Sequence, residues 1–139
     1  MMNVKEIMWL AEDEGMEASL ACQPKPVVFA QAKNLLTNEI IPGTEQIIED
    51  GLCGFAWVTI LSKTPENKEF IKELKKAKLI SGINEYPVRP WHKNIDGPGY
   101  KYWVGLNTQS VARKEAFAEA FADTLKKFGI TAHVGSRLD

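Results

Sequence analysis

The fold of this 139-residue chain is decided by residues 100–139, which run YKYWVGLNTQSVARKEAFAEAFADTLKKFGITAHVGSRLD. Apolar residues alternate over residues 100–106, which predicts a strand with one face formed by Tyr100, Tyr102, Val104 and Leu106. Residues 111–128 have helical spacing, which predicts a long helix with one stripe formed by Phe117, Phe121, Leu125 and Phe128. Gly129 then favours a helix C-terminus, and the alternation over residues 130–134 predicts a strand that returns to the sheet.

The middle of the chain predicts a second strand and helix of the same layer. Gly54–Leu61 is apolar on both faces, which predicts a strand in the centre of a sheet. The stretch Thr64-Pro65-Glu66 supplies a cap, a first-turn proline and a first-turn acid, so it predicts the start of a helix. The buried stripe of this helix is expected to contain Phe70, Ile71, Leu74 and Ala77.

Residues 83–88 predict a further strand, which Pro87 confines to a sheet edge, and residues 89–99 predict a loop. The order from residue 54 onward is therefore strand, helix, strand, strand, helix, strand. This order predicts an α+β fold, namely a ferredoxin-like βαββαβ antiparallel sheet with two helices on one face. We expect one core that contains Phe117, Phe121, Leu125, Phe70, Ile71, Leu74, Trp57 and Val104.

Residues 1–50 predict a helical extension, and residues 51–139 form the α+β domain. Within the extension we expect helical segments at residues 4–11, 16–23, 27–38 and 45–50. Asn3 caps the first segment, and the acids and glycine of residues 12–15 are expected to end it. Trp9 and Leu10 lie off the apolar stripe of this segment, which indicates burial against a second surface.

The composition is that of an ordinary globular domain. Hydrophobic residues make up 45% and charged residues 25% of the chain, so we expect one domain with a substantial core. No apolar run approaches the roughly 20 residues that a membrane-spanning helix needs, and residues 1–11 lack the apolar stretch of a signal peptide. Cys22 and Cys53 are too few for a disulfide framework, so a cytoplasmic location is expected.

The charge is divided unevenly along the chain. Residues 1–50 carry 3 Lys or Arg against 9 Asp or Glu, whereas residues 51–139 carry 14 against 9. The first segment therefore has a formal charge of −6 and the second of +5, which gives the net charge of −1. This division predicts that the acidic segment docks on the basic part of a neighbouring subunit, or else that it folds over its own domain.

Cys53 is the one candidate nucleophile. It lies between glycines, and a reactive thiolate there requires a base such as His92 or His133. The alternative is a small buried thiol at the start of a strand. The spacing of the cysteines and histidines matches no metal site, and we expect no catalytic residue, no metal and no cofactor.

The predicted interface combines Trp9 and Leu10 with a cluster in residues 89–93, namely Arg89, Trp91, His92 and Lys93. Tryptophan and arginine dominate the hot spots of protein–protein interfaces. Basic residues interleaved with aromatic ones also suit the phosphates and bases of nucleic acids. A third explanation is a loop that Trp91 fixes to its own domain.

Three functions follow from these observations. The first is a non-enzymatic structural subunit that assembles with itself or with other protein subunits. The second is a ferredoxin-like module that binds nucleic acid or a small effector, which is less favoured because residues 100–106 lack the full pattern of an RNA-recognition sheet. The third is a cysteine-dependent hydrolase built on Cys53.

In size and α+β composition the chain loosely resembles the small connector, tail-completion and capsid-accessory proteins of tailed phages. The resemblance covers the general plan only and assigns no site residue. It implies a viral structural protein, located in the virion or in the host cytoplasm, with other protein subunits as partners.

Overall fold

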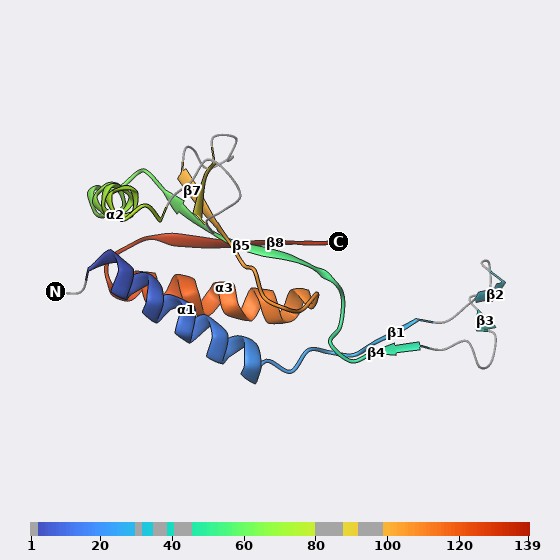
Figure 1. Ribbon diagram of the computed structural model, residues 1–139. Helices are drawn as coiled ribbons and strands as arrows, with labels where there is room; N and C mark the ends of the chain where they lie inside the picture. Colours follow the sequence, from blue (N-terminus) through green and yellow to red (C-terminus); the bar gives the residue numbers. More distant parts are fainter. Residues whose placement is uncertain (1–2, 30–31, 35–38, 41–45, 80–87, 92–98) are drawn as a thin grey trace.

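The computed structural model describes residues 3–29, 32–34, 39–40, 46–79, 88–91 and 99–139 (Figure 1). Three helices lie in this part of the chain: α1 (Val4–Ala21), α2 (Pro65–Lys76) and α3 (Val111–Lys127). The strands are β1 (Val27–Phe29), β2 (Ala32–Asn34), β3 (Glu39–Ile40), β4 (Gln46–Ile48), β5 (Gly54–Leu61), β6 (Val88–Trp91), β7 (Gly99–Trp103) and β8 (Ala132–Leu138). The α+β class predicted from the sequence is confirmed.

The main sheet is antiparallel and is built around β5. Strand β5 lies between β7 and β8, and β6 pairs with the outer edge of β7, which gives the order β6-β7-β5-β8. The prediction that residues 54–61 form a central strand is confirmed. The prediction that residue 89 begins a loop is wrong, because Arg89 pairs with Lys101 and Trp91 with Gly99. Pro90 is tolerated here because β6 lies at the edge of the described sheet.

One face of the sheet, the inner face, carries the core. Ala56, Val58 and Ile60 of β5 are fully buried, and they share one cluster with Tyr102 and Val104. All three helices contribute to this cluster, chiefly through Ile7, Met8, Ala11, Phe70, Ile71, Leu74, Phe117, Phe121 and Leu125. The two-residue period of β5 and β7 therefore determines which side of the sheet the helices cover.

Helix α3 begins and ends as its sequence predicts. The Ser110 side chain accepts a hydrogen bond from the Arg113 amide at the N-terminus. At the C-terminus Gly129 has a φ of 82°, and the Ile130 amide donates back to the Leu125 carbonyl. Phe128 is the exception in the predicted stripe, since it caps the helix and is 37% exposed.

Helix α2 is fixed to the sheet by a buried amide. Thr64 caps the helix, as predicted, by accepting from the Asn67 amide. The Asn67 side chain donates to the carbonyls of Leu61 and Thr131 and accepts from the Thr131 amide, at 2.8–2.9 Å. One side chain thus joins the end of β5, the start of α2 and the chain that enters β8.

Helix α1 differs from the prediction because it does not stop at residues 12–15. It continues to Ala21, and Gly15 is buried inside it. A Cβ at Gly15 would lie 2.9 Å from the Phe117 ring, so the missing side chain allows α1 to approach α3 closely. Gly15 serves helix packing here, and Asp13 and Glu14 stay exposed on a continuous helix.

The predicted helices at residues 27–38 and 45–50 are also wrong. Val27–Phe29 pairs antiparallel with Gln46–Ile48, and Ala32–Asn34 pairs with Glu39–Ile40. Valine, isoleucine and phenylalanine favour an extended backbone, and hairpin pairing satisfies their amides, so the strand preference prevails over a weak helical period. These four strands, which we call the arm, project away from the helices and the main sheet (Figure 1).

Trp57 does not belong to the inner core, contrary to prediction. Its neighbours Ala56 and Val58 point inward, so the alternation of β5 turns Trp57 to the opposite face. There it stacks on Trp103. The other seven residues predicted for the core lie in the inner cluster.

Candidate interaction surfaces

Helix α1 has a second apolar face, which points away from the domain. Trp9 and Leu20 are each 74% exposed and Met16 is 46% exposed. At 100° per residue these three positions fall within about 40° of one another, on the side of the helix away from the buried positions Ile7, Ala11 and Gly15. We call Trp9, Met16 and Leu20 the outer stripe. Three large apolar side chains aligned on one exposed helix face indicate an interaction surface.

The outer stripe is acidic at its margins. Helix α1 contains one basic residue, Lys5, and five acidic residues, Glu6, Glu12, Asp13, Glu14 and Glu17. Asp13 is exposed and lies at the edge of the stripe, about 20° beyond Leu20. A partner surface for this helix therefore needs apolar area together with positive charge.

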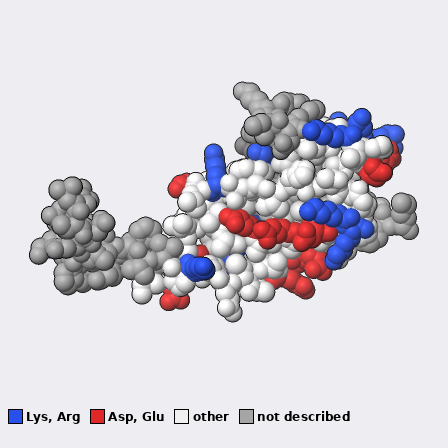
Figure 2. Space-filling view, turned by 180° about the vertical axis from the view of Figure 1, so that it is seen from behind, with Lys and Arg blue, Asp and Glu red and all other residues white. Residues whose placement is uncertain are grey.

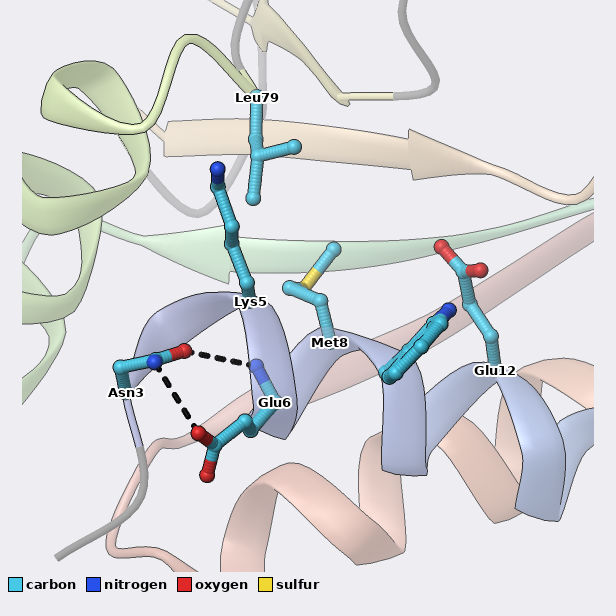
Figure 3. Close-up of a pocket in the computed structure, with 7 residues that line it drawn as sticks. Asn3, Lys5, Glu6, Met8, Glu12 and Leu79 are labelled. Carbon is cyan, nitrogen blue, oxygen red and sulfur yellow. Dashed lines mark hydrogen bonds between the residues drawn. The ribbon is translucent and has the colours of Figure 1, made fainter.

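A pocket of about 410 Å³ opens beside Trp9 (Figure 3). Met8, Trp9 and Leu79 supply its apolar wall, and the polar lining comes from Asn3, Lys5, Glu6 and Glu12. Figure 3 shows the Asn3 side chain hydrogen-bonded to both the amide and the carboxylate of Glu6, which is the cap that begins α1. A protruding indole next to a hollow is a shape suited to a partner's side chain.

Glu12 connects α1 to the inner face of the sheet. Its carboxyl group is hydrogen-bonded to the buried Tyr102 hydroxyl. Burial raises the pKa of Glu12 above 4.5, and the neighbouring Asp13 charge raises it further, against the hydrogen bond from Tyr102. Burial, together with the Glu12 charge, raises the pKa of Tyr102 well above 10. This carboxyl group is therefore part of the packing between α1 and β7.

The base of the arm is held by α3. The Arg113 guanidinium donates to the Ser19 carbonyl at 2.8 Å and to the Asp50 carboxylate at 3.2 Å. The Ser110 hydroxyl donates to the Asp50 carbonyl at 2.6 Å. The end of α1 and the return strand of the arm thus meet on the first turn of α3, so the direction of the arm is coupled to that of α1.

The outer face of the main sheet carries a row of aromatic rings. Trp57 and Trp103 stack with ring centres 5.5 Å apart and an interplanar angle of 9°, and Phe55 lies 5.6 Å from Trp103. The Trp57 indole lies over Gly135 of β8, where a Cβ would overlap the ring. We call Phe55, Trp57 and Trp103 the aromatic platform. All three side chains are partly exposed.

Cations surround the aromatic platform. The Lys101 Nζ lies 4.3 Å from the centre of the Trp57 ring, and the Arg137 guanidinium lies 5.4 Å from that of Phe55. The Lys114 Nζ lies 5.1 Å from the Phe55 ring, but Lys114 is buried on α3 and donates to the Gly54 carbonyl at 3.0 Å. Burial lowers the pKa of Lys101, and the Arg137 charge lowers it further. None of the outward positions of β5, β7 and β8 holds Asp or Glu. This face is therefore basic and aromatic.

Elsewhere the charges are mixed. The space-filling view from behind shows a row of acidic side chains with basic ones at its end (Figure 2). Exposed ion pairs of this kind occur within the helices, as in Lys126–Asp123 of α3 and Lys76–Glu73 of α2. Such i, i+3 pairs are typical of solvated helix faces.

Of the six residues predicted as an interface, four lie within the described residues, two in α1 and two in β6. Trp9 lies in the outer stripe, and Leu10 beside it is half-buried. Arg89 and Trp91 lie in β6, and His92 and Lys93 lie outside the described residues. Met16, Leu20 and the aromatic platform were not predicted from the sequence. An uninterrupted helix through Gly15 would have aligned the first two with Trp9, but the stacking of Trp57 on Trp103 requires the β5–β7 register.

Cys53 is half-buried and lies next to the start of β5. Its carbonyl accepts the Asp139 amide at 3.1 Å. His133 pairs with Thr59, six residues from Cys53, which is about 20 Å along an extended strand. His133 therefore cannot act as the base for this thiol, and His92 lies outside the described residues.

Within the part of the chain that the structure describes, no cluster of three or more His, Cys, Asp or Glu could hold a metal ion. Among the same residues, no helix is both long and apolar enough to cross a membrane. No protein-family model, curated protein or solved structure matches the chain.

Proposed function

We propose that this chain is a non-enzymatic structural subunit that assembles with further copies of itself. The observation that carries the proposal is the outer stripe of α1, where Trp9 and Leu20 are exposed although the opposite side of the same helix is core. A helix that served its own domain alone would gain nothing from three large apolar residues facing water. Truncating such an aromatic residue at an interface typically weakens binding by about 2 kcal/mol or more.

The arm supports the same proposal. A two-stranded hairpin is marginally stable by itself in water, and the pairs β1–β4 and β2–β3 are each described with two strands only. Ile47 on the arm is 65% exposed. The unpaired edges of such strands are a template for pairing with another chain. A second copy is the partner we favour, since the acidic α1 and the basic residues 51–139 give each copy both signs of charge.

The resemblance in general plan extends the proposal to a virion component of a tailed phage, located in the virion or the host cytoplasm. For the fold we propose the ferredoxin-like βαββαβ type. The strand order β8-β5-β7-β6, with α2 between β5 and β6 and α3 between β7 and β8, supports this assignment.

The mass of the protein in solution tests the proposal. Light scattering over a range of protein concentrations should show species larger than the monomer, and Leu20→Ser should shift them to monomer. Leu138→Ser is the matched control, because Leu138 is also largely exposed, at 60%, but lies on β8 outside the outer stripe. A wild-type protein that stays monomeric at all concentrations, or assembly that both substitutions weaken equally, would contradict the proposal.

Salt separates the two contributions to assembly. Screening shortens the reach of charges to about 3 Å at 1 M salt, whereas apolar burial persists. We therefore expect slower assembly in 1 M salt without complete dissociation. Complete dissociation would mean that charge alone holds the subunits together and that the outer stripe has no part in the contact.

A further inference from the structure

The outer face of the sheet is unlike an ordinary solvated face. An antiparallel sheet with one face on the core normally alternates to polar residues on the other face. Here β5 and β7 present Phe55, Trp57 and Trp103 instead, while the three described helices contribute their buried side chains to the inner cluster. A sheet with two apolar faces is expected to be covered by a layer on each side.

We infer that the outer stripe of α1 in one subunit docks on the aromatic platform of the next copy of the same chain. The inference rests on the proposed function and identifies the surface that receives α1. It assigns α1 two roles, because its inner side completes the core of its own domain and its outer side covers the aromatic platform of a neighbour.

The two surfaces are complementary in chemistry. The outer stripe is apolar, with Asp13 at its edge and Glu17 further round the helix on the same side. The platform is aromatic, with Lys101 and Arg137 placed over its rings. Docking would bring carboxylates close to cations that lie on ring faces, while Trp9, Met16 and Leu20 meet the rings themselves.

The two surfaces are also similar in size. Eleven residues of helix separate Trp9 from Leu20, which is about 17 Å. Strands β7, β5 and β8 together span about 10 Å between their axes, and residues 55–59 of β5 extend about 13 Å. A single helix laid across the platform would therefore cover it.

The contact cannot form within one subunit. Helix α1 packs along α3, and α3 in turn covers the inner face of the sheet, so the outer stripe and the platform lie on opposite sides of the domain (Figure 1). The contact must be heterologous, with different surfaces of the two copies meeting. Repetition of such a contact produces a closed ring or an open filament.

A mixing experiment tests this arrangement directly. Trp9→Lys inactivates the docking helix, and Trp103→Ala inactivates the platform. We expect each variant alone to be monomeric, with the dissociation constant raised at least tenfold, and an equimolar mixture to form a 1:1 dimer that grows no further. Light scattering and native mass spectrometry distinguish these species.

Arg137→Glu keeps the test valid if Trp103→Ala fails to fold, since the Arg137 side chain is exposed. It should weaken assembly alone and recover assembly when combined with Asp13→Lys in the same chain. Unchanged assembly of both platform variants, with Trp9→Lys still monomeric, would overturn the inference and leave the proposed function intact. A wild-type protein that never assembles would instead refute the proposed function.

Single-stranded nucleic acid is the alternative occupant, because bases stack on aromatic residues beside cations. A fluorescent 12-nucleotide single strand serves as the probe. If Trp103→Ala abolishes its binding and leaves assembly unchanged, the platform is a nucleic-acid site and the inference is overturned. No binding of the probe by the wild-type protein, together with the 1:1 dimer in the mixture, supports the docking of α1.

Discussion

The two faces of the main sheet differ in how far their apolar side chains are buried. The inner face includes Val58 and Ile60, which are completely buried under the helices. The outer face carries Trp57 and Trp103, which stack on each other and lie near cations. Exposure of aliphatic side chains to water is unfavourable, whereas an indole next to a lysine can be either exposed to solvent or covered by a partner. The inner face thus holds the subunit together, and the outer face is suited to a reversible contact.

The largest expected effect on stability comes from removing a large buried side chain from the inner face. Phe121 is completely buried between Tyr102 and Phe117, with ring centres 4.2 and 6.1 Å away. Phe121→Ala should lower the free energy of unfolding by about 3–5 kcal/mol, because it leaves a cavity in a packed core. Denaturant unfolding followed by circular dichroism measures the change. A loss below about 1 kcal/mol would mean that the inner face does not carry the stability of the domain.

Gly135→Ala, which adds a side chain on the outer face, should have an intermediate effect on the free energy of unfolding. The new Cβ would occupy the space of the Trp57 indole, so the ring must move off β8 or the strand must shift. Overpacking of this kind typically costs about 1–3 kcal/mol. Because the ring is partly exposed, we expect the low end of that range in unfolding experiments, together with a clear change in tryptophan fluorescence. Gly105→Ala is the control, since no atom lies within 4 Å of its Cβ position.

Trp57→Ala should lower the free energy of unfolding by less than Gly135→Ala. It removes a partly exposed stacking partner of Trp103, and such aromatic pairs contribute about 0.5–1.5 kcal/mol beyond their buried area. We expect a modest loss in the free energy of unfolding together with a large loss of assembly. A loss of stability as great as that of Phe121→Ala would place Trp57 in the core of the domain and remove the contrast between the faces.

The contrast also explains what the sequence could predict. Residues 100–139 fold as their periodicity indicates because both the strand and α3 bury one regular face, and regular burial leaves a regular pattern. Thr64 and Asn3 act as the predicted caps because capping is a local interaction. The α+β class follows from these local elements and their order.

The errors arise where a distant partner determines the structure. The sequence predicts that Gly15 ends a helix. In the structure Gly15 lies inside α1, because the Phe117 ring on α3 leaves no space for a side chain there. The arm strands β1 and β4 pair across almost twenty residues, so neither shows its partner locally. The aromatic platform needs the register that sets Trp57 opposite Trp103, and no motif in either strand announces it.

The smallest expected effect concerns Glu12, whose carboxyl group reaches the inner face of the sheet. The pKa of Glu12 is raised above 4.5 in the folded protein, chiefly by burial, so the folded state keeps its proton to a higher pH than the unfolded chain does. As the pH rises from about 4.5, the unfolded chain loses this proton first, and the contribution of Glu12 to stability falls until the folded carboxyl group has also ionised. Glu12→Gln has no carboxyl group to ionise at this position. The stability of this variant relative to the wild type should therefore be highest near pH 7 and should shrink toward pH 4.

Tyr102→Phe is the control with the opposite expectation. It removes the hydrogen bond that favours the ionised carboxylate, so the stability of this variant should fall more steeply with rising pH than that of the wild type. Urea unfolding of the three proteins between pH 4 and pH 7 measures both changes. A difference between Glu12→Gln and the wild type that stays constant with pH would show that Glu12 lies in water rather than against the inner face of the sheet.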